Sequence, residues 1–194
     1  MEIIDDYIYS KTLQLDLDVM KSSVYTLYDL AMEKFYTPKQ PEQNRQHFAR
    51  HNLLLYPFPG FHKLYTEIRN FFHEVVKPEE PYYIQCWHNV YKYGDFNEWH
   101  RHWMPEAKSW HGFYCVDVEP SYTSYKLPHR TDIVDIQSRN NLLVLARGND
   151  DIHRSSQWDH QDRDRITLGY DMVPAKYLFK NFSKRGWLNH WVPL

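Results

Sequence analysis

Five short segments rich in β-branched and aromatic residues follow one another in the second half of the chain, and no helical pattern interrupts them. Turn-forming Gly, Pro, Asn and Asp residues separate them. The segments are YYIQCWHNVYKY at 82–93, GFYCVDV at 112–118, TDIVDI at 131–136, NLLVLA at 141–146 and RITLGYD at 165–171. Consecutive short strands favour an antiparallel sandwich or jelly roll over an alternating α/β fold.

Two amphipathic helices are expected before these strands. In Leu17–Phe35, apolar residues recur every three or four positions, and Asp16 can cap the N-terminus of the helix. A second helical pattern covers residues 61–75 and ends before Pro78. We therefore expect both helices to pack against one sheet of the β core.

A chain of 194 residues is long enough for one domain with a real core and short for two. We expect a single domain over residues 1–194. Its predicted parts are a helical N-terminal part at 1–80, a β core at 81–171 and a packed C-terminal element of undetermined type at 172–194.

Charge and hydropathy narrow the classes of partner. Lys and Arg total 23 against 25 Asp and Glu, without a basic cluster that could follow a phosphate backbone, so nucleic acid is not expected. No apolar run approaches the roughly 18 residues of a membrane span, and the first residues, MEIIDDYIYSK, are acidic where a signal peptide would be basic. Cys86 and Cys115 fall in predicted strands and are interpreted as buried thiols. These features predict a soluble cytoplasmic protein with no membrane partner.

The sharpest local feature is a pair of histidines, His100 and His102. Side chains two residues apart on a strand point to the same side, so both imidazoles can reach one metal ion. An isolated pair of this kind is more often two exposed histidines at a strand end. A third histidine, His153, follows the strand at 141–146, and a jelly roll brings such distant residues together at its mouth. Three ligands that leave positions open are what an iron oxygenase needs.

Arg165 and Thr167 open the last predicted strand and share one of its faces. A guanidinium matches a carboxylate through two parallel hydrogen bonds, and the hydroxyl can assist. The alternative is that Arg165 forms a surface salt bridge within the charged segment around it. On an earlier strand Asn89 and Tyr91 share a face and can line a co-substrate pocket, although sheet packing is equally open for Tyr91.

Taken in this order, the residues resemble the 2-oxoglutarate- and Fe(II)-dependent oxygenase superfamily, and more narrowly a prolyl-hydroxylase-like group of bacteria and phages. The matching stretches are WHN at 87–89, YGD at 93–95, WHRH at 99–102, GFY at 112–114, LLVL at 142–145 leading to His153, and RITL at 165–168. The resemblance implies a mainly β, α+β chain with a double-stranded β-helix, or jelly-roll, fold. It also implies Fe(II) bound at His100, His102 and His153, and 2-oxoglutarate bound as co-substrate through its distal carboxylate at Arg165 and Thr167.

One position departs from the superfamily pattern. Most members carry His-x-Asp or His-x-Glu, whereas this chain has His102 where the carboxylate is expected. Three neutral imidazoles give Fe(II) one negative charge fewer, which alters affinity and redox behaviour. Glu98 as the source of the carboxylate, and His102 as a hydrogen-bonding residue rather than a ligand, remain alternatives. Halogenase chemistry is disfavoured because it needs a small residue at this position.

The implied activity is hydroxylation of a protein side chain or a small metabolite, and the motifs leave the primary substrate and the oligomeric state open. Two other functions are alternatives: a cupin-like three-histidine metal enzyme, which needs no carboxylate clamp at Arg165, and a non-catalytic jelly-roll interaction module. His111, His129 and His160 could enter the site from loops, but surface positions are expected for all three. Asp151 can orient His153 through its second ring nitrogen. Whether the charged segment 148–164 closes over the site as a lid is also open.

Overall fold

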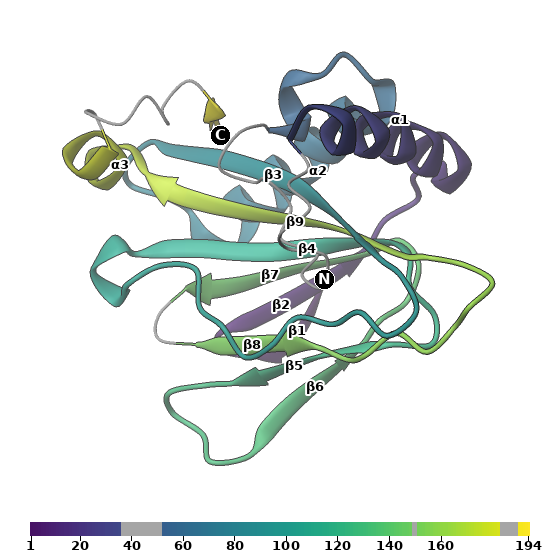
Figure 1. The fold of residues 1–194 in the computed structure, drawn as a ribbon. Helices are drawn as coiled ribbons and strands as arrows, with labels where there is room; N and C mark the ends of the chain where they lie inside the picture. Colours follow the sequence, from purple (N-terminus) through teal and green to yellow (C-terminus); the bar gives the residue numbers. More distant parts are fainter. Residues whose placement is uncertain (36–51, 149–150, 183–189) are drawn as a thin grey trace.

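The computed structural model describes residues 1–35, 52–148, 151–182 and 190–194, and two antiparallel sheets dominate them (Figure 1). The larger sheet has seven strands in the order β1-β2-β7-β4-β9-β3-β10, and the smaller has three in the order β6-β5-β8. The strands are β1 (Glu2–Asp5), β2 (Ile8–Thr12), β3 (Tyr82–Tyr91), β4 (Ser109–Asp117), β5 (Tyr122–Lys126), β6 (Ile133–Gln137), β7 (Leu142–Gly148), β8 (Ile152–Ser155), β9 (Arg165–Pro174) and β10 (Val192–Pro193). The prediction of a mainly β jelly roll is confirmed.

Both expected helices are present, as α1 (Leu17–Phe35) and α2 (Pro59–Val76). Asp16 caps α1 as predicted, because its Oδ1 accepts hydrogen bonds from the backbone N–H groups of Asp18 and Val19, both at 3.1 Å. Short 3₁₀ helices η1 (Leu53–Leu55) and η2 (Pro105–Ala107) precede α2 and β4. A third α-helix, α3 (Ala175–Phe182), and β10 form the described part of the C-terminal element, whose type the sequence left open.

Among the described residues, strands β1, β2, β5 and β8 lie where the sequence predicts no regular element. Each has only four or five residues, and polar side chains such as those in YTSYK (β5) and IHRS (β8) weaken the hydrophobic signal. Long-range pairing forms them, since β2 pairs with β7 and β8 pairs with β5. Residues 1–80 therefore contribute two strands to the larger sheet as well as the two helices.

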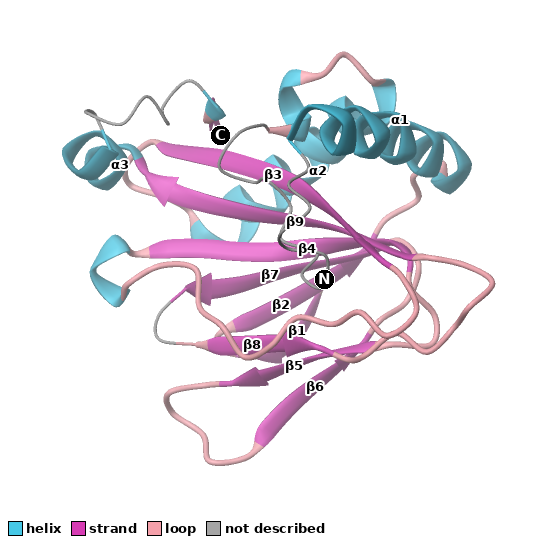
Figure 2. Cartoon of the chain, viewed as in Figure 1, coloured by secondary structure: helices cyan, strands magenta, loops and turns pink. Residues whose placement is uncertain are grey.

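Strand alternation divides the hydrophobic core into two layers. Helices α1 and α2 pack on the outer face of the larger sheet, away from the smaller sheet, where Met20 and Phe61 meet alternate strand residues such as Tyr114 and Tyr170 (Figure 2). The second layer, which includes Phe113, fills the space between the sheets. Each large buried side chain contributes on the order of 1.5–3 kcal/mol, so both layers matter for stability.

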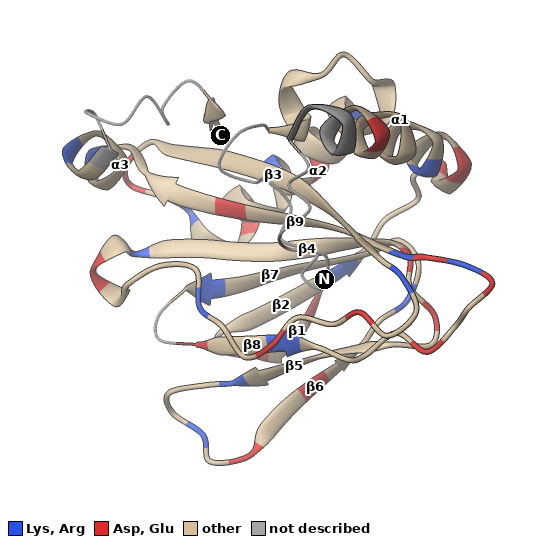
Figure 3. Cartoon of the chain, viewed as in Figure 1, with Lys and Arg blue, Asp and Glu red and all other residues tan. Residues whose placement is uncertain are grey.

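The inner face of the larger sheet carries the chemistry. Cys115 of β4 packs between the sheets and is the cross-strand partner of Thr167, so Arg165, Thr167 and Asp171 of β9 face inward with it. Figure 3 shows that charged residues lie mainly in loops and helices, while the strands of the larger sheet carry few. Buried charges at Arg165 and Asp171 are therefore exceptions that call for partners.

Among the described residues, no helix combines the length and the apolar character needed to cross a membrane.

Candidate metal centre

Three histidines meet at one end of the space between the sheets. His100, His102 and His153 each bring one ring nitrogen to within 4.8 Å of the other two. Their ring centroids lie 5.2 Å (His100–His102), 4.4 Å (His100–His153) and 4.9 Å (His102–His153) apart. One ion could therefore bind all three nitrogens.

The prediction that His100 and His102 lie on one strand is wrong. β3 ends at Tyr91 before a turn at Gly94, whose φ of +87° a glycine adopts without strain. The chain then follows the free edge of β8, where the backbone N–H of His100 donates to the His153 carbonyl and the reverse bond forms, both at 3.0 Å. It leaves that edge before η2. The two rings therefore meet through one backbone bridge and side-chain contacts rather than through strand alternation.

An acceptor oxygen lies behind each of the three rings. Nδ1 of His100 donates to the Glu98 carbonyl at 2.7 Å, and Nδ1 of His102 donates to Oδ1 of Asp171 at 2.6 Å. Nδ1 of His153 lies 3.5 Å from Oδ2 of Asp151. A carbonyl oxygen only accepts, so Nδ1 of His100 carries the hydrogen and Nε2 keeps its lone pair. For His100 and His102 this is the usual arrangement of metal-binding histidines, whose outer nitrogen is held by an oxygen. The buried Nδ1 of His153, in contrast, forms no hydrogen bond.

Burial favours the neutral form of two of the candidate ligand rings, His100 and His153. Removal from water, together with the nearby His102, lowers the pKa of His100 to about 4. Burial also holds the pKa of His153 well below its usual value, and the His111, His102 and His100 rings add to this effect. Neutral imidazole is the form that binds metals, so His100 and His153 can bind a cation at neutral pH.

The expectation that His111 lies at the surface is wrong. His111 is buried, its Nε2 lies 2.8 Å from Oδ2 of Asp151, and its ring stacks on His153 at 4.7 Å. Although burial alone would lower the pKa of His111, the Asp151 carboxylate raises it overall. His111 and His153 hold the Asp151 pKa well below its usual range against the opposing effect of burial. Strand alternation could have indicated the inward position of His111, because Phe113 and Cys115 share its face.

The other two histidines expected at the surface lie there. The side chain of His129 is 38% exposed and pairs with Asp5, and that of His160 is 34% exposed. Neither belongs to the groups of described residues that could hold a metal ion.

The residues expected to bind the co-substrate form one block across β3 and β9. Tyr91 pairs with Arg165 and Asn89 with Thr167 in the strand register. The Asn89 amide Nδ2 donates to Oγ1 of Thr167 at 3.3 Å, and the Arg165 guanidinium lies 4.9 Å from the centre of the Tyr91 ring. All four side chains are buried.

Arg165 is 1% exposed, so the surface salt bridge considered for it is wrong. Its Nη1 donates to the carbonyl of Ser156 at 3.3 Å, while its buried Nε has no hydrogen-bond partner. Among residues 1–35, 52–148, 151–182 and 190–194, no carboxylate lies within ion-pair distance of it. A buried guanidinium without an anion is costly, so the pocket is suited to an anionic ligand.

The Trp87 ring lies across β9, next to the histidine cluster. A Cβ at Gly169 would lie 2.8–2.9 Å from three atoms of the Trp87 indole, so glycine lets the ring lie across β9. The centre of that ring is 5.5 Å from that of His102. The Trp87 ring therefore packs against the histidine cluster.

The described part of the charged segment 148–164 is anchored. It contains β8, followed by the fully buried Trp158, whose backbone exchanges hydrogen bonds with Asp95 and Gly94 at 2.9 and 2.7 Å. Further along, the Tyr25 hydroxyl donates to Oδ2 of Asp164 at 2.9 Å. These contacts hold residues 156–164 against the body of the protein.

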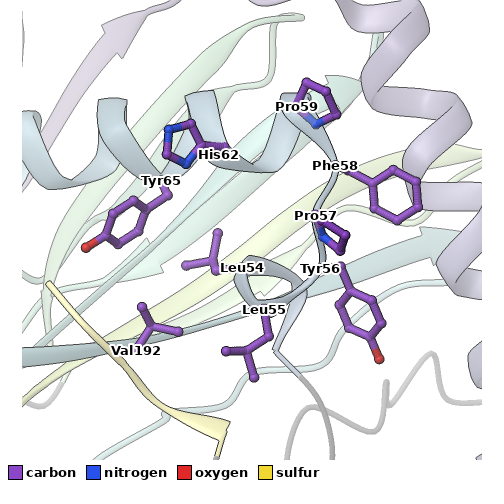
Figure 4. Close-up of a pocket in the computed structure, with 9 residues that line it drawn as sticks. All are labelled: Leu54, Leu55, Tyr56, Pro57, Phe58, Pro59, His62, Tyr65 and Val192. Atoms are coloured by element: carbon purple, nitrogen blue, oxygen red, sulfur yellow. The ribbon is translucent and has the colours of Figure 1, made fainter.

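Two of the cavities formed by the described residues lie outside the histidine cluster. One of about 540 Å³ lies at the start of α2 (Figure 4). Its described lining consists of Leu54, Leu55, Tyr56, Pro57, Phe58, Pro59, His62, Tyr65 and Val192. The other, of about 460 Å³, is lined in part by Glu98, Trp99, Ser155 and Ser156, so it borders the backbone next to His100 and Arg165.

The fold and the site together define a class of protein: a double-stranded β-helix with a candidate metal centre between its sheets. Solved structures similar to this chain include prolyl hydroxylases and the non-heme alpha ketoglutarate dependent carbocyclase SnoK, which confirms the resemblance inferred from the sequence at the level of the fold. No protein-family model matches the sequence, and no curated protein does either.

Three of these structures share the fold over most of their length. AviO1 from Streptomyces viridochromogenes has a TM-score of 0.63 at 13% identity, covering 88% of this chain and 90% of its own. A Trichoplax adhaerens prolyl hydroxylase, in complex with a peptide fragment of the hypoxia inducible factor oxygen degradation domain, has a TM-score of 0.62 at 10% identity, covering 91% and 87%. A Pseudomonas putida prolyl-4-hydroxylase has a TM-score of 0.52 at 13% identity, covering 87% and 86%.

Proposed function

We propose that the chain is an Fe(II)- and 2-oxoglutarate-dependent dioxygenase that hydroxylates a protein side chain or a small metabolite. His100, His102 and His153 bind the iron, and Arg165 binds the distal carboxylate of 2-oxoglutarate. The observation that carries the proposal is the buried Arg165, which has no carboxylate partner among the described residues and lies on the same inner face as the centre. The fold shared with prolyl hydroxylases and with a non-heme alpha ketoglutarate dependent carbocyclase supports it.

The donor set fits the proposed metal. Three imidazoles can bind Fe(II) and would leave coordination positions open for ligands other than protein. Because Nδ1 of His100 and of His102 is occupied by an oxygen, Nε2 of each ring is the atom that would bind the ion. The bound iron and co-substrate would supply the oxygen activation and decarboxylation that side chains cannot.

The pocket residues bind and orient the co-substrate. The Arg165 guanidinium can form two parallel hydrogen bonds with the distal carboxylate, and the Thr167 hydroxyl can add a third. Asn89 holds Thr167 in place through the 3.3 Å hydrogen bond, and the Tyr91 ring lies against the guanidinium. Because all four residues are buried, water is excluded and these contacts are stronger than they would be at the surface.

A cupin-like metal enzyme without 2-oxoglutarate is the second candidate, because the three histidines alone would serve it. It gives no reason to bury an arginine without a carboxylate. A non-catalytic jelly-roll module likewise gives no reason for three histidine rings around one point. The buried Arg165 therefore favours the dioxygenase over both.

Anaerobic titration of metal-free protein with Fe(II) and then 2-oxoglutarate tests the proposal. We expect the weak visible charge-transfer band of the iron–2-oxoglutarate chelate to form with the unmodified protein and to be lost in Arg165→Ala. Arg139→Ala is the matched control, because the side chain of Arg139 is 60% exposed. Iron binding without the band would favour the cupin-like function, and absence of iron binding would leave the non-catalytic module.

A further inference from the structure

Asp171 holds two consecutive residues of the loop that carries the metal ligands. Its Oδ1 accepts a hydrogen bond from Nδ1 of His102 at 2.6 Å, and its Oδ2 accepts one from Nε1 of Trp103 at 2.9 Å. Asp171 lies within β9, paired with Gln85 of β3 on one side and His111 of β4 on the other. Since β9 is hydrogen-bonded along both edges, the backbone under this carboxylate is firmly held.

The three candidate ligands differ in the oxygen that lies next to their Nδ1 atom. His100 is held by a carbonyl group, which carries no net charge. His153 lies 3.5 Å from the Asp151 carboxylate, and the same oxygen is closer to His111, at 2.8 Å. Only His102, of the three, has a short hydrogen bond to a carboxylate. His102 is also the residue at the position where a directly coordinating carboxylate is expected from the sequence pattern.

A carboxylate behind an imidazole acts on the metal through the ring. It fixes the orientation of the ring and makes the opposite nitrogen a more strongly donating ligand. The Asp171 side chain is 8% exposed, so little water screens its charge. Trp103 adds to the fixation, since its ring lies 5.9 Å from that of Trp191 while its N–H occupies Oδ2.

We propose that Asp171 is the positioning residue of the metal centre and supplies, through His102, the negative charge that a directly bound carboxylate would otherwise give. The inference rests on the proposed metal-binding function and deepens it. It explains how a three-imidazole centre can hold a divalent transition-metal ion without an acidic ligand of its own. It also assigns Asp171 a role that its position in the middle of a strand does not suggest.

The charge of Asp171 can be separated from its shape. In Asp171→Asn alone, an amide oxygen can still accept from His102, but the amide N–H₂ then faces the N–H of Trp103, and two donors clash. Trp103→Phe removes that indole N–H and keeps an aromatic ring. The double variant Asp171→Asn/Trp103→Phe, compared with Trp103→Phe, therefore removes the charge while retaining an acceptor for His102.

The test is titration of the metal-free full chain with Co(II) in competition with a chelator, alongside the visible spectrum of the bound Co(II). We expect the double variant to bind Co(II) about 10–100-fold more weakly than Trp103→Phe. We also expect its Co(II) absorption bands to shift, because the donor strength of His102 changes. The unfolding midpoint of the metal-free protein should be similar in the two variants, which separates the effect from misfolding.

Equal Co(II) affinity and equal spectra in the two variants would overturn the inference. A loss of affinity seen only together with a lowered unfolding midpoint would also overturn it, since Asp171 would then serve the fold alone. Failure of the unmodified protein to bind Co(II) or Fe(II) would instead reject the proposed metal centre itself. The two failures are therefore distinguishable.

Discussion

His102 and Glu98 show how a single residue position determines the character of the centre. Glu98 is exposed in the middle of the loop between β3 and η2, and its backbone carbonyl rather than its carboxylate contacts the site through His100. His102 directs its ring to the other two histidines and its Nδ1 to Asp171. This geometry favours His102 over Glu98 as the third ligand.

Substitution of these two residues tests that assignment. We expect His102→Ala to weaken Fe(II) binding by more than the roughly 10–100-fold typical of residues outside the ligand set, because one of three ligands is lost. Glu98→Ala, the matched control from the same loop, should leave the affinity unchanged. Isothermal titration under anaerobic conditions measures both. Equal losses in the two variants would make Glu98 a ligand.

At the scale of the elements, strands β4, β7 and β9 meet at one close contact, which involves Gly112, Val144 and Tyr170. The Tyr170 side chain of β9 crosses Gly112 of β4, and its hydroxyl donates to the Val144 carbonyl of β7 at 2.5 Å. A Cβ at Gly112 would lie 1.9 Å from that carbonyl oxygen and 2.6 Å from the Tyr170 oxygen. Backbone cannot yield as a flexible side chain can, so this position requires glycine.

Gly112→Ala should therefore destabilise the protein by about 1–3 kcal/mol or more, as overpacking does. Gly60→Ala is the control, because its Cβ would meet the flexible end of Met20 at 3.3 Å and lie within helix α2. Alanine there should be neutral or stabilising by about 0.4–1 kcal/mol. Urea denaturation of the metal-free variants gives both values. Equal stability of Gly112→Ala and the unmodified protein would show that Tyr170 can move aside.

At the scale of the whole molecule, the fold separates stability from chemistry. The helices and the outer face of the larger sheet form one apolar layer, and the inner face combines apolar packing with the histidine cluster. Asn52 ties distant parts together: its amide Nδ2 donates to the carbonyls of Ile84 and His190 at 3.0 and 2.7 Å. Its Oδ1 accepts hydrogen bonds from the N–H groups of Leu54 and Cys86.

The ionisable groups buried between the sheets make the stability of the whole protein depend on pH.

The metal-free protein should lose stability as the pH falls from about 6.5 to about 4. Folding lowers the pKa of His100 from 6.5 to about 4, so in this window the unfolded chain binds more protons than the folded one. His153, whose pKa is also lowered by burial, acts in the same direction. The raised pKa of His111 has the opposite sign, and its contribution is lost as the pH rises through that raised value.

Thermal unfolding at several pH values measures this dependence. The unfolding midpoint should fall between pH 6.5 and 4, and it should fall less in His100→Asn, which lacks one of the depressed groups. A midpoint that stays constant across this window in the unmodified protein would contradict the effect of burial on His100 and His153.

The sequence by itself determined the elements whose signal is local. The apolar spacing and the Asp16 cap of α1 involve neighbouring residues only, and they predicted Leu17–Phe35, the bounds that the structure shows. The longer strands β3, β7 and β9 were predicted for the same reason, since their apolar runs need no knowledge of a partner. The order of His100, His102, His153 and Arg165 likewise indicated the candidate site, because the order and spacing of these residues can be seen in the sequence alone.

Only the tertiary structure decided which residues complete the site. β8 forms because it pairs with β5 and with the loop at His100, and that pairing turns His153 inward. His111 and Asp171 come from separate strands and become partners of the histidine cluster through the register of β4 and β9. The His111–Asp151 contact joins residues 40 positions apart, and the His102–Asp171 contact joins residues 69 positions apart. Both contacts depend on strand register and on the packing of the two sheets, which no local sequence pattern encodes.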